Sequence, residues 1–210
     1  PSIAWRIDWT GFAVAETRSS GLPGLTIGAN GEATMQATTV NAQLSGAGLA
    51  LDLAGRVPFS GGDPNIRATG SAPLELVGLF TDRELRLGGV ARLDLTISSA
   101  TAINGTVTLA DATIVDTNTA FGVTGVGGQI RLNGTTATLQ GVSGQMAQGG
   151  RITVAGTVTI DPAAGLPANL TINVANGRYN DGTTVDATYT AALALSGPLL
   201  TTGTVSGRVD

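Results

Sequence analysis

Leu170-Thr171-Ile172-Asn173-Val174 alternates apolar and polar side chains without a break. Successive side chains of a β-strand point to opposite faces, so this period of two predicts a strand with one apolar face and one polar face. The use of the apolar face decides what the protein does, because that face either packs into a closed core or forms a surface that holds apolar ligands. The same alternation recurs at 49–53, 93–97, 107–109, 130–132, 152–154 and 158–160.

The composition of the 210 residues supports an all-β chain. Hydrophobic residues make up 42% of the sequence and aromatic residues only 4%, so the apolar surface is mainly aliphatic. Val, Ile and Thr favour strands, and the 31 glycines suit many tight turns. Strand-like stretches recur at the short intervals expected of an all-β architecture. We predict strands at 3–9, 12–17, 25–29, 33–38, 40–45, 49–57, 66–72, 85–88, 90–98, 103–110, 112–116, 121–125, 128–133, 136–140, 142–147, 150–155, 157–161, 168–175, 184–190, 192–196 and 203–209.

Residues 73–84 break the alternation. Their apolar side chains are spaced more like those of a helix, with Pro73 at a suitable first position, which predicts a short helix near 74–83. No flexible linker surrounds this seam, so we expect one continuous domain over 1–210. The chain opens with Pro1 and ends in a strand-like stretch, and we therefore expect it to be a fragment of a longer chain.

A Gly-x-apolar-x-apolar unit recurs at a spacing near 50 residues, at Gly105, Gly156 and Gly203. A period of this length is typical of stacked repeat units. Such units cannot bury their apolar faces alone, and a stack of them would build one continuous apolar surface.

Charge and residue types exclude several functions. The net charge is −4 and no cluster of basic residues occurs, so nucleic acid is not an expected partner. The sequence has no cysteine and no histidine, which removes thiolate catalysis, the usual catalytic triad and the commonest metal ligands. We expect no enzyme activity and no cofactor, and we interpret the scattered carboxylates as surface charges: Asp94, Asp111, Asp116, Asp161 and Asp186.

Three further features have alternative interpretations. The oxygen-rich turns 61–65 and 180–182 could hold calcium but lack the spacing of a known calcium loop, and ordinary turn chemistry explains them better. The segment 122–128 lacks the residues of a phosphate loop and is interpreted as a hairpin or bulge. Trp5 and Trp9 share parity with Ile3 and Ile7, so they should lie on the same face. The aromatic rings of the first half either anchor a core or close an apolar trough; they are Trp5, Trp9, Phe12, Phe59 and Phe80.

The apolar face is the candidate site. Fourteen aliphatic residues should share one side of the strands, and the same alternation adds Val205 and Val209. Burying each such side chain is worth roughly 1.5–3 kcal/mol, so they should face another sheet, a lipid or one another across a folded sheet. The predicted lining of a lipid groove is Val107, Leu109, Ile130, Leu132, Leu139, Ile152, Val154, Val158, Ile160, Leu170, Ile172, Val174, Leu193 and Leu195.

The order of several stretches carries a family resemblance. Gly149-Gly150-Arg151-Ile152-Thr153-Val154 opens a glycine-led strand, and further matching stretches lie at 103–109, 128–134, 137–139, 155–160, 167–176, 194–199 and 203–205. In this order and spacing, 101–210 resembles the C-terminal repeat of the TamB family (translocation and assembly module subunit) in the AsmA-like superfamily. Residues 1–100 are similar to an upstream repeat region.

The resemblance implies a fold and a location. The fold would be a long, curved, mostly antiparallel sheet folded lengthwise into an open β-taco trough with an apolar interior. The location would be the periplasm of a Gram-negative bacterium, in a protein anchored to the inner membrane by a part outside this sequence. The implied partners are a TamA-like outer-membrane barrel protein, phospholipid acyl chains and nascent outer-membrane proteins.

Our leading hypothesis is a non-catalytic groove for phospholipid transport between the inner and outer membranes, for assembly of outer-membrane proteins, or for both. Small aliphatic walls suit acyl chains because their contact is non-directional. Unpaired strand edges could instead pair with a barrel strand. The alternative is a structural or adhesive β-solenoid of an exported surface protein, a class that is also rich in Gly, Thr and Asn.

Overall fold

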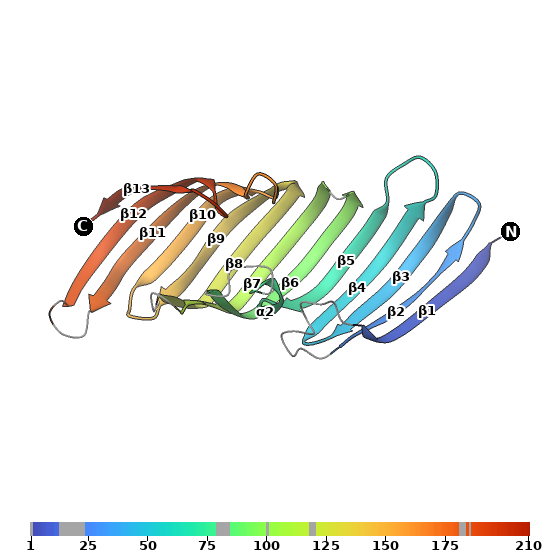
Figure 1. Ribbon diagram of the computed structural model, residues 1–210, viewed down its shortest axis with the longest axis horizontal. Helices are drawn as coiled ribbons and strands as arrows, with labels where there is room; N and C mark the ends of the chain where they lie inside the picture. The colour runs from blue at the N-terminus through green and yellow to red at the C-terminus, as the bar shows by residue number, and fades with distance from the viewer. Residues whose placement is uncertain are drawn as a thin grey trace.

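The chain forms one antiparallel sheet in which every strand pairs with its neighbours in sequence (Figure 1). A computed structural model describes residues 2–12, 24–78, 85–99, 101–117, 121–180, 184 and 186–210. The all-β, antiparallel prediction is confirmed. The thirteen strands are β1 Ile3–Phe12, β2 Leu25–Ala33, β3 Ala37–Gly46, β4 Leu49–Pro58, β5 Asn65–Pro73, β6 Leu85–Ser99, β7 Ala102–Asp116, β8 Gly122–Gly134, β9 Thr136–Met146, β10 Arg151–Thr159, β11 Pro167–Asn180, β12 Asp186–Pro198 and β13 Thr204–Val209.

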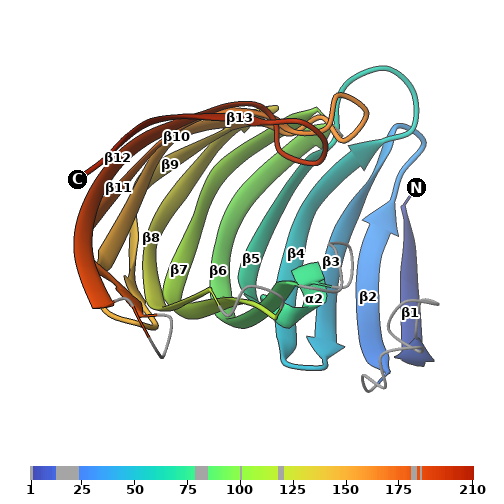
Figure 2. The ribbon, with the colours of Figure 1, turned by 60° about the vertical axis from the view of Figure 1, so that its left-hand side comes forward.

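The sheet is a single open layer. Its strands are bowed along their length (Figure 2), but the sheet is neither closed nor strongly curled. Strands β1 and β13 form its two edges, and the chain ends lie at opposite ends of the row of strands. Within the described residues no second sheet covers either face, so the faces are distinguished only by their side chains.

One lateral row of side chains crosses the whole sheet. Its members are directly opposite one another from strand to strand, and all but two are large apolar residues. The row consists of Trp9, Ile27, Leu44, Leu51, Gly70, Leu93, Val107, Ile130, Leu139, Gly156, Leu170, Leu195 and Val205. Directly opposite residues share a face in an antiparallel pair, so this row marks one continuous apolar face.

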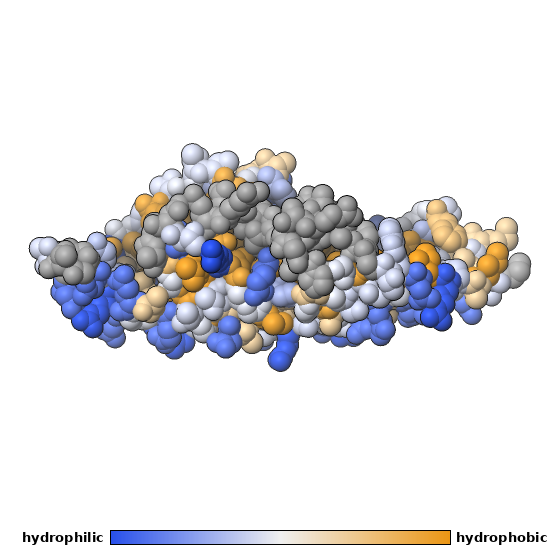
Figure 3. Space-filling view, turned by 60° about the horizontal axis from the view of Figure 1, so that its bottom comes forward, coloured by the Kyte–Doolittle hydropathy of each residue, from blue (hydrophilic) through white to orange (hydrophobic). Residues whose placement is uncertain are grey.

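Burial follows the same alternation. In β3 and β4, side chains of the apolar face are partly buried, whereas those between them are exposed. No large side chain in the described part of the chain is fully buried. Figure 3 shows hydrophilic residues along the lower side of the molecule and hydrophobic residues above and between them. The apolar face is therefore shielded mainly by its own neighbours and not by a second layer.

The tightest packing lies in the middle of the apolar face. Ala112, Val123, Val126 and Val142 form a buried cluster, and Leu74 from the end of β5 packs against it. The backbone N–H of Leu74 donates to the carbonyl of Gly89 at 2.9 Å, which ties this corner to β6. The cluster is small because three β-branched side chains and an alanine fill little volume.

The predicted helix near 74–83 is reduced, among the described residues, to the single turn α2 (Glu75–Gly78). Residues 79–84 lie outside the described part. One turn closes too few hydrogen bonds to count as an independent helix, because fixing the first turn is the costly step. Strands β6 and β7 pair across residue 100, so the predicted regions 1–100 and 101–210 belong to one sheet.

Several predicted strand pairs are in fact single long strands. Residues 85–88 and 90–98 both belong to β6, and 121–125 and 128–133 both belong to β8. Opposite Gly88–Val90 the extra residue lies in β7, between Ala110 and Thr113, and in β8 an extra residue lies between Thr124 and Gly127. A β-bulge adds one residue and shifts the period of two, which looks like a strand end in the sequence. The same correction joins 103–110 with 112–116, 136–140 with 142–147, 150–155 with 157–161 and 184–190 with 192–196.

The strand predicted at 33–38 is wrong, because these residues contain a turn between β2 and β3. The hydroxyl of Thr34 donates to the carbonyl of Ala37 at 3.0 Å and accepts from its N–H at 3.2 Å. A threonine that bonds the nearby backbone in this way favours a turn over a continuing strand. The predicted strand at 12–17 lies mostly outside the described residues.

Gly105 and Gly156, two of the three glycines of the predicted repeat, share one backbone geometry. Each has a φ of 135°, and a Cβ added to either would lie within about 2.2 Å of a carbonyl oxygen in the next strand. The third predicted member, Gly203, precedes β13 and lacks this geometry. Gly207 has it instead, with a φ of 140° and the same close approach to the neighbouring strand.

Candidate functional site

The register places the predicted groove residues on one face. Val107, Ile130, Leu139, Leu170 and Leu195 belong to the row described above. The others occupy flanking positions of the same parity on β7 to β12, and Ile160 follows the last residue of β10. These flanking residues are Leu109, Leu132, Ile152, Val154, Val158, Ile172, Val174 and Leu193.

The burial of these residues is incomplete. Leu170 and Val174 are 8% and 9% exposed, Ile160 is 39% exposed, and the remaining predicted residues are partly buried. At the sheet edge, Val205 and Val209 are 58% and 61% exposed. Strand neighbours supply most of the cover, because adjacent strands lie about 4.8 Å apart and their side chains touch laterally.

The apolar face extends further than the sequence indicated. Ile27, Leu44, Leu51 and Leu93 continue the row through the N-terminal half, where no groove residue was predicted. The alternation at 49–53 and 93–97 was the signal that could have found Leu51 and Leu93. With thirteen strands at about 4.8 Å, the row is roughly 58 Å long.

The aromatic rings of the N-terminal half were expected either to anchor a core or to close an apolar trough, and the structure places them differently from one another. Trp5 lies over Gly31 of β2 and its indole N–H donates to the Thr38 hydroxyl at 2.8 Å, which anchors the ring to the sheet. Trp9 shares this face, as its parity predicted, and is 55% exposed. Phe59 is 57% exposed in the connection after β4, and Phe80 lies outside the described residues, as does the side chain of Phe12.

The opposite face is polar and carries ion pairs. Arg67 on β5 holds Asp94 on β6 through two hydrogen bonds of 3.1 Å, and Arg178 on β11 pairs with Asp186 on β12. The hydrogen bond from Arg178 lowers the pKa of Asp186 below its ordinary value. All these side chains are about half exposed or more, so each pair adds little to stability.

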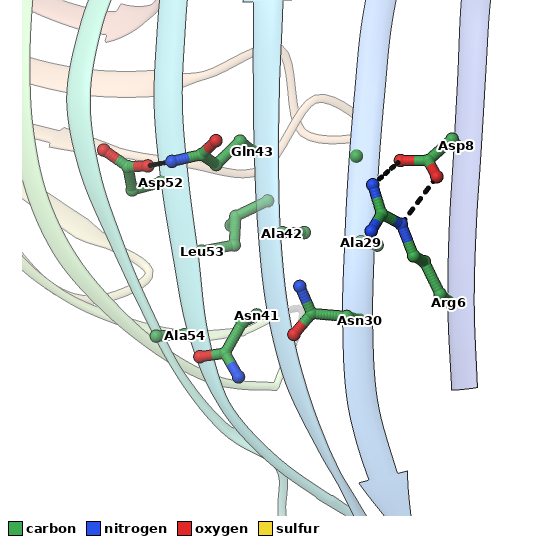
Figure 4. Close-up of a pocket in the computed structure, with 11 residues that line it drawn as sticks. Arg6, Asp8, Ala29, Asn30, Asn41, Ala42, Gln43, Asp52, Leu53 and Ala54 are labelled. Atoms are coloured by element: carbon green, nitrogen blue, oxygen red, sulfur yellow. Dashed lines mark hydrogen bonds and ion pairs between the residues drawn. The ribbon is translucent and has the colours of Figure 1, made fainter. Parts of the chain in front are cut away.

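A shallow hollow of about 520 Å³ lies on this polar face across β1 to β4 (Figure 4). The Arg6–Asp8 ion pair on β1 and the hydrogen bond from Gln43 to Asp52 border it. Asn30 and Asn41 line the hollow between these pairs. Every charged group here already has an opposite or polar partner, so the hollow offers no concentrated charge to a ligand.

The described residues hold no arrangement suited to a resident metal. No group of three or more potential metal-ligating acids occurs in the described part of the chain. The turn 61–65 connects β4 to β5, and 122–128 lies within β8 at its bulges, in agreement with the bulge interpretation. Among the described residues, no helix is long and apolar enough to cross a membrane.

Comparisons with known proteins give no assignment. No protein-family model matches the chain, and no curated protein or solved structure matches it either. The function therefore has to be argued from the apolar face itself.

Proposed function

We propose that the apolar face of the sheet is an open trough for phospholipid acyl chains and that the protein acts without catalysis. The observation that carries the proposal is the row of eleven large apolar side chains, broken only by Gly70 and Gly156, on a face that no second layer covers in the described residues. Covering partly buried aliphatic side chains with a hydrocarbon is favourable by roughly 25 cal/mol per Å² of apolar surface removed from water.

The length and chemistry of the face suit a sliding ligand. The row of roughly 58 Å is about twice the thickness of the hydrocarbon core of a bilayer, which is about 30 Å. Its walls are Leu, Ile and Val, which contact an acyl chain without fixing its direction. The polar face and the exposed strand ends leave water beside the strip, so a headgroup can remain hydrated while its acyl chains lie on the sheet.

The bow of the strands supports the trough. Figure 2 shows the curvature, and Leu74 beside α2 packs against the buried cluster of the apolar face, which places the corner before α2 on that face. The bow leaves this face open to a narrow ligand, because the sheet is neither closed nor strongly curled. Closure around the ligand would need only a tighter bow of the same single layer.

The location and partners rest on the family resemblance. We infer a periplasmic protein of a Gram-negative bacterium that works beside a TamA-like outer-membrane barrel protein. An exposed strand edge would allow a nascent outer-membrane protein to add a strand to the sheet. Phospholipid acyl chains would instead lie on the apolar face.

The proposal predicts different contacts for two adjacent residues of β8. Leu132 lies on the apolar face opposite Gly105 and Ala137, whereas Arg131 is exposed on the polar face. A photo-crosslinking amino acid at Leu132 should capture lipid from mixed vesicles of phosphatidylethanolamine and phosphatidylglycerol, and the same group at Arg131 should not. Mass spectrometry of the crosslinked chain measures both.

Equal capture of lipid at Leu132 and Arg131 would indicate non-specific contact with the membrane and would contradict the proposal. Capture at neither position, from a chain that keeps its β-sheet circular dichroism, would favour the structural alternative of an exported surface protein.

A further inference from the structure

A small pocket of about 170 Å³ lies at one rim of the sheet, where β8 and β12 begin and β9 and β11 end. Side chains from strands far apart in the sequence line it, among them Phe121, Met146, Gln148, Arg178, Tyr179 and Tyr189. Phe121, Tyr179 and Tyr189 are also the only aromatic residues that follow Phe80 in the sequence. The chain is poor in aromatic residues, and it gathers those of its C-terminal half around one hollow.

The two tyrosines of the pocket lie on the apolar face. Tyr189 belongs to the unbroken alternation of β12 that leads to Leu195 of the row. Its ring lies over Gly177 of β11, where an added Cβ would come within 2.6 Å of the ring. Just before Gly177, β11 has an extra residue, with Asn176 at a φ of 52°. This bulge returns Gly177 and Tyr179 to the apolar face.

The other side of the pocket lies on the same face. Val123 of β8 is buried in the central apolar cluster, and Phe121 shares its parity. Met146 of β9 is directly opposite Val123. The N–H of Ala147 donates to the carbonyl of Gly122 at 2.8 Å, so β8 and β9 remain paired up to the pocket. The pocket is therefore the end of the apolar face at this rim and is continuous with it.

The volume of the pocket limits what can fill it. A water molecule occupies about 30 Å³ in the liquid, so a group of roughly six non-hydrogen atoms fits. The acyl chain of a membrane lipid is too large for this space. An ester group together with the carbons of the glycerol that it joins is of the right size.

The polar groups of the pocket favour a neutral hydrogen-bond acceptor. Arg178 is held by Asp186 through two hydrogen bonds, and Oε1 of Gln148 accepts from a backbone N–H of β11 at 3.2 Å. The hydroxyls of Tyr179 and Tyr189 make no hydrogen bond within the described part of the chain. A phenol hydroxyl can donate to a carbonyl oxygen, and the charge of Arg178 is already balanced.

We propose that this pocket holds the glycerol ester group of a diacyl lipid, with the hydroxyls of Tyr179 and Tyr189 donating to its carbonyl oxygens. The inference rests on the proposed function, because the acyl chains continue from the pocket onto the apolar face. Tyr189 is six residues from Leu195 on β12, so an acyl chain that follows this strand reaches the row after roughly 20 Å. Tyrosine suits this position because its ring is apolar and its tip is polar, as in the aromatic belts at the headgroup level of membranes.

Two lipids that differ only in their carbonyl groups test the contact. Dihexanoyl phosphatidylcholine has two ester carbonyls, and its dihexyl ether analogue has none. Below the concentrations at which these lipids form micelles, we expect the chain to bind the ester lipid about tenfold more tightly in isothermal titration calorimetry. A variant with both Tyr179→Phe and Tyr189→Phe keeps the rings and should bind both lipids with the affinity that the unmodified chain has for the ether lipid. The control Thr188→Val removes an exposed hydroxyl of the polar face and should keep the preference.

Equal binding of the two lipids by the unmodified chain would overturn the inference and leave the trough itself unaffected. A preference for the ester lipid that survives in the variant without tyrosine hydroxyls would overturn it in the same way. Binding of neither lipid would contradict the trough and, with it, the ester site.

Fluorine NMR tests the position of the lipid. The chain has two tyrosines and both line the pocket, so a chain labelled with 3-fluorotyrosine should give two signals from this site. Both signals should shift when dihexanoyl phosphatidylcholine binds. Unchanged signals from a chain that carries the lipid in native mass spectrometry would place the lipid elsewhere on the apolar face and would contradict the ester site.

Discussion

Replacing Gly156 with alanine is expected to destabilise the neighbourhood of β10 and β11 by about 3 kcal/mol. Gly156 has a φ of 135°, and a Cβ there would lie 2.2 Å from the carbonyl oxygen of Asn169 and 2.9 Å from the α-carbon of Leu170. Both atoms belong to the backbone of β11, so no flexible side chain can move aside. The strands must separate or the backbone must change its conformation.

Hydrogen exchange measures this effect where it arises. Each strand contacts essentially its two neighbours, so we expect faster exchange in β9 to β12 and little change in β1 to β4. Gly28→Ala is the matched control, because Gly28 is also in a strand but its added Cβ would meet only Asp8 Oδ1 at 3.6 Å. If hydrogen exchange in β9 to β12 is equally fast in Gly156→Ala and Gly28→Ala, the close approach of β10 and β11 does not depend on Gly156.

Leu170→Asp is expected to lower the free energy of unfolding by about 3–5 kcal/mol. Leu170 is 8% exposed and lies opposite Gly156 on one side and Leu195 on the other. The change removes apolar packing and places a carboxylate between partners that cannot bond to it. Urea denaturation followed by circular dichroism gives the difference.

The neighbouring residue supplies the control. Thr171 is exposed on the polar face opposite Ala155 and Ala194, so Thr171→Asp should change stability by less than about 0.5 kcal/mol. Two substitutions one residue apart thus separate the faces. Similar losses in both variants would mean that the two faces do not differ as described.

The sequence predicted most of the strand positions but not the pairing of the strands. The alternation at 107–109, 130–132 and 170–174 identified both the all-β class and the side of the strands on which these residues lie. Alternation reports only the local environment of a strand. It does not report which strand lies beside which, so the row from Trp9 to Val205 became visible only with the register.

Some of the errors in strand length have one physical cause. Between Leu109 and Ala112 in β7, and between Thr124 and Gly127 in β8, a bulge shifts the parity, and a strand that continues looks as if it had ended. The misplaced repeat has a similar origin, because Gly203 and Gly207 both follow the local pattern but only Gly207 approaches the neighbouring backbone closely. The distance between two strand backbones depends on how the strands pair, so the sequence of one strand alone does not predict it.

The extent of the apolar face was also underestimated. Leu44, Leu51 and Leu93 were not predicted as groove residues, because the family resemblance was clearest over the C-terminal half of the chain. The structure joins them to the predicted residues through consecutive strand pairs. The candidate site therefore spans all thirteen strands and includes Trp9 at one edge and Val205 at the other.

Native mass spectrometry of the chain, purified from bacterial cells under gentle conditions, tests the central claim most directly. We expect adducts of phospholipid mass on the unmodified chain and on Arg131→Asp. These adducts should be lost from a Leu132→Asp variant that keeps its β-sheet circular dichroism. Absence of phospholipid from the unmodified chain, or its full retention by folded Leu132→Asp, would contradict an open apolar face that holds acyl chains.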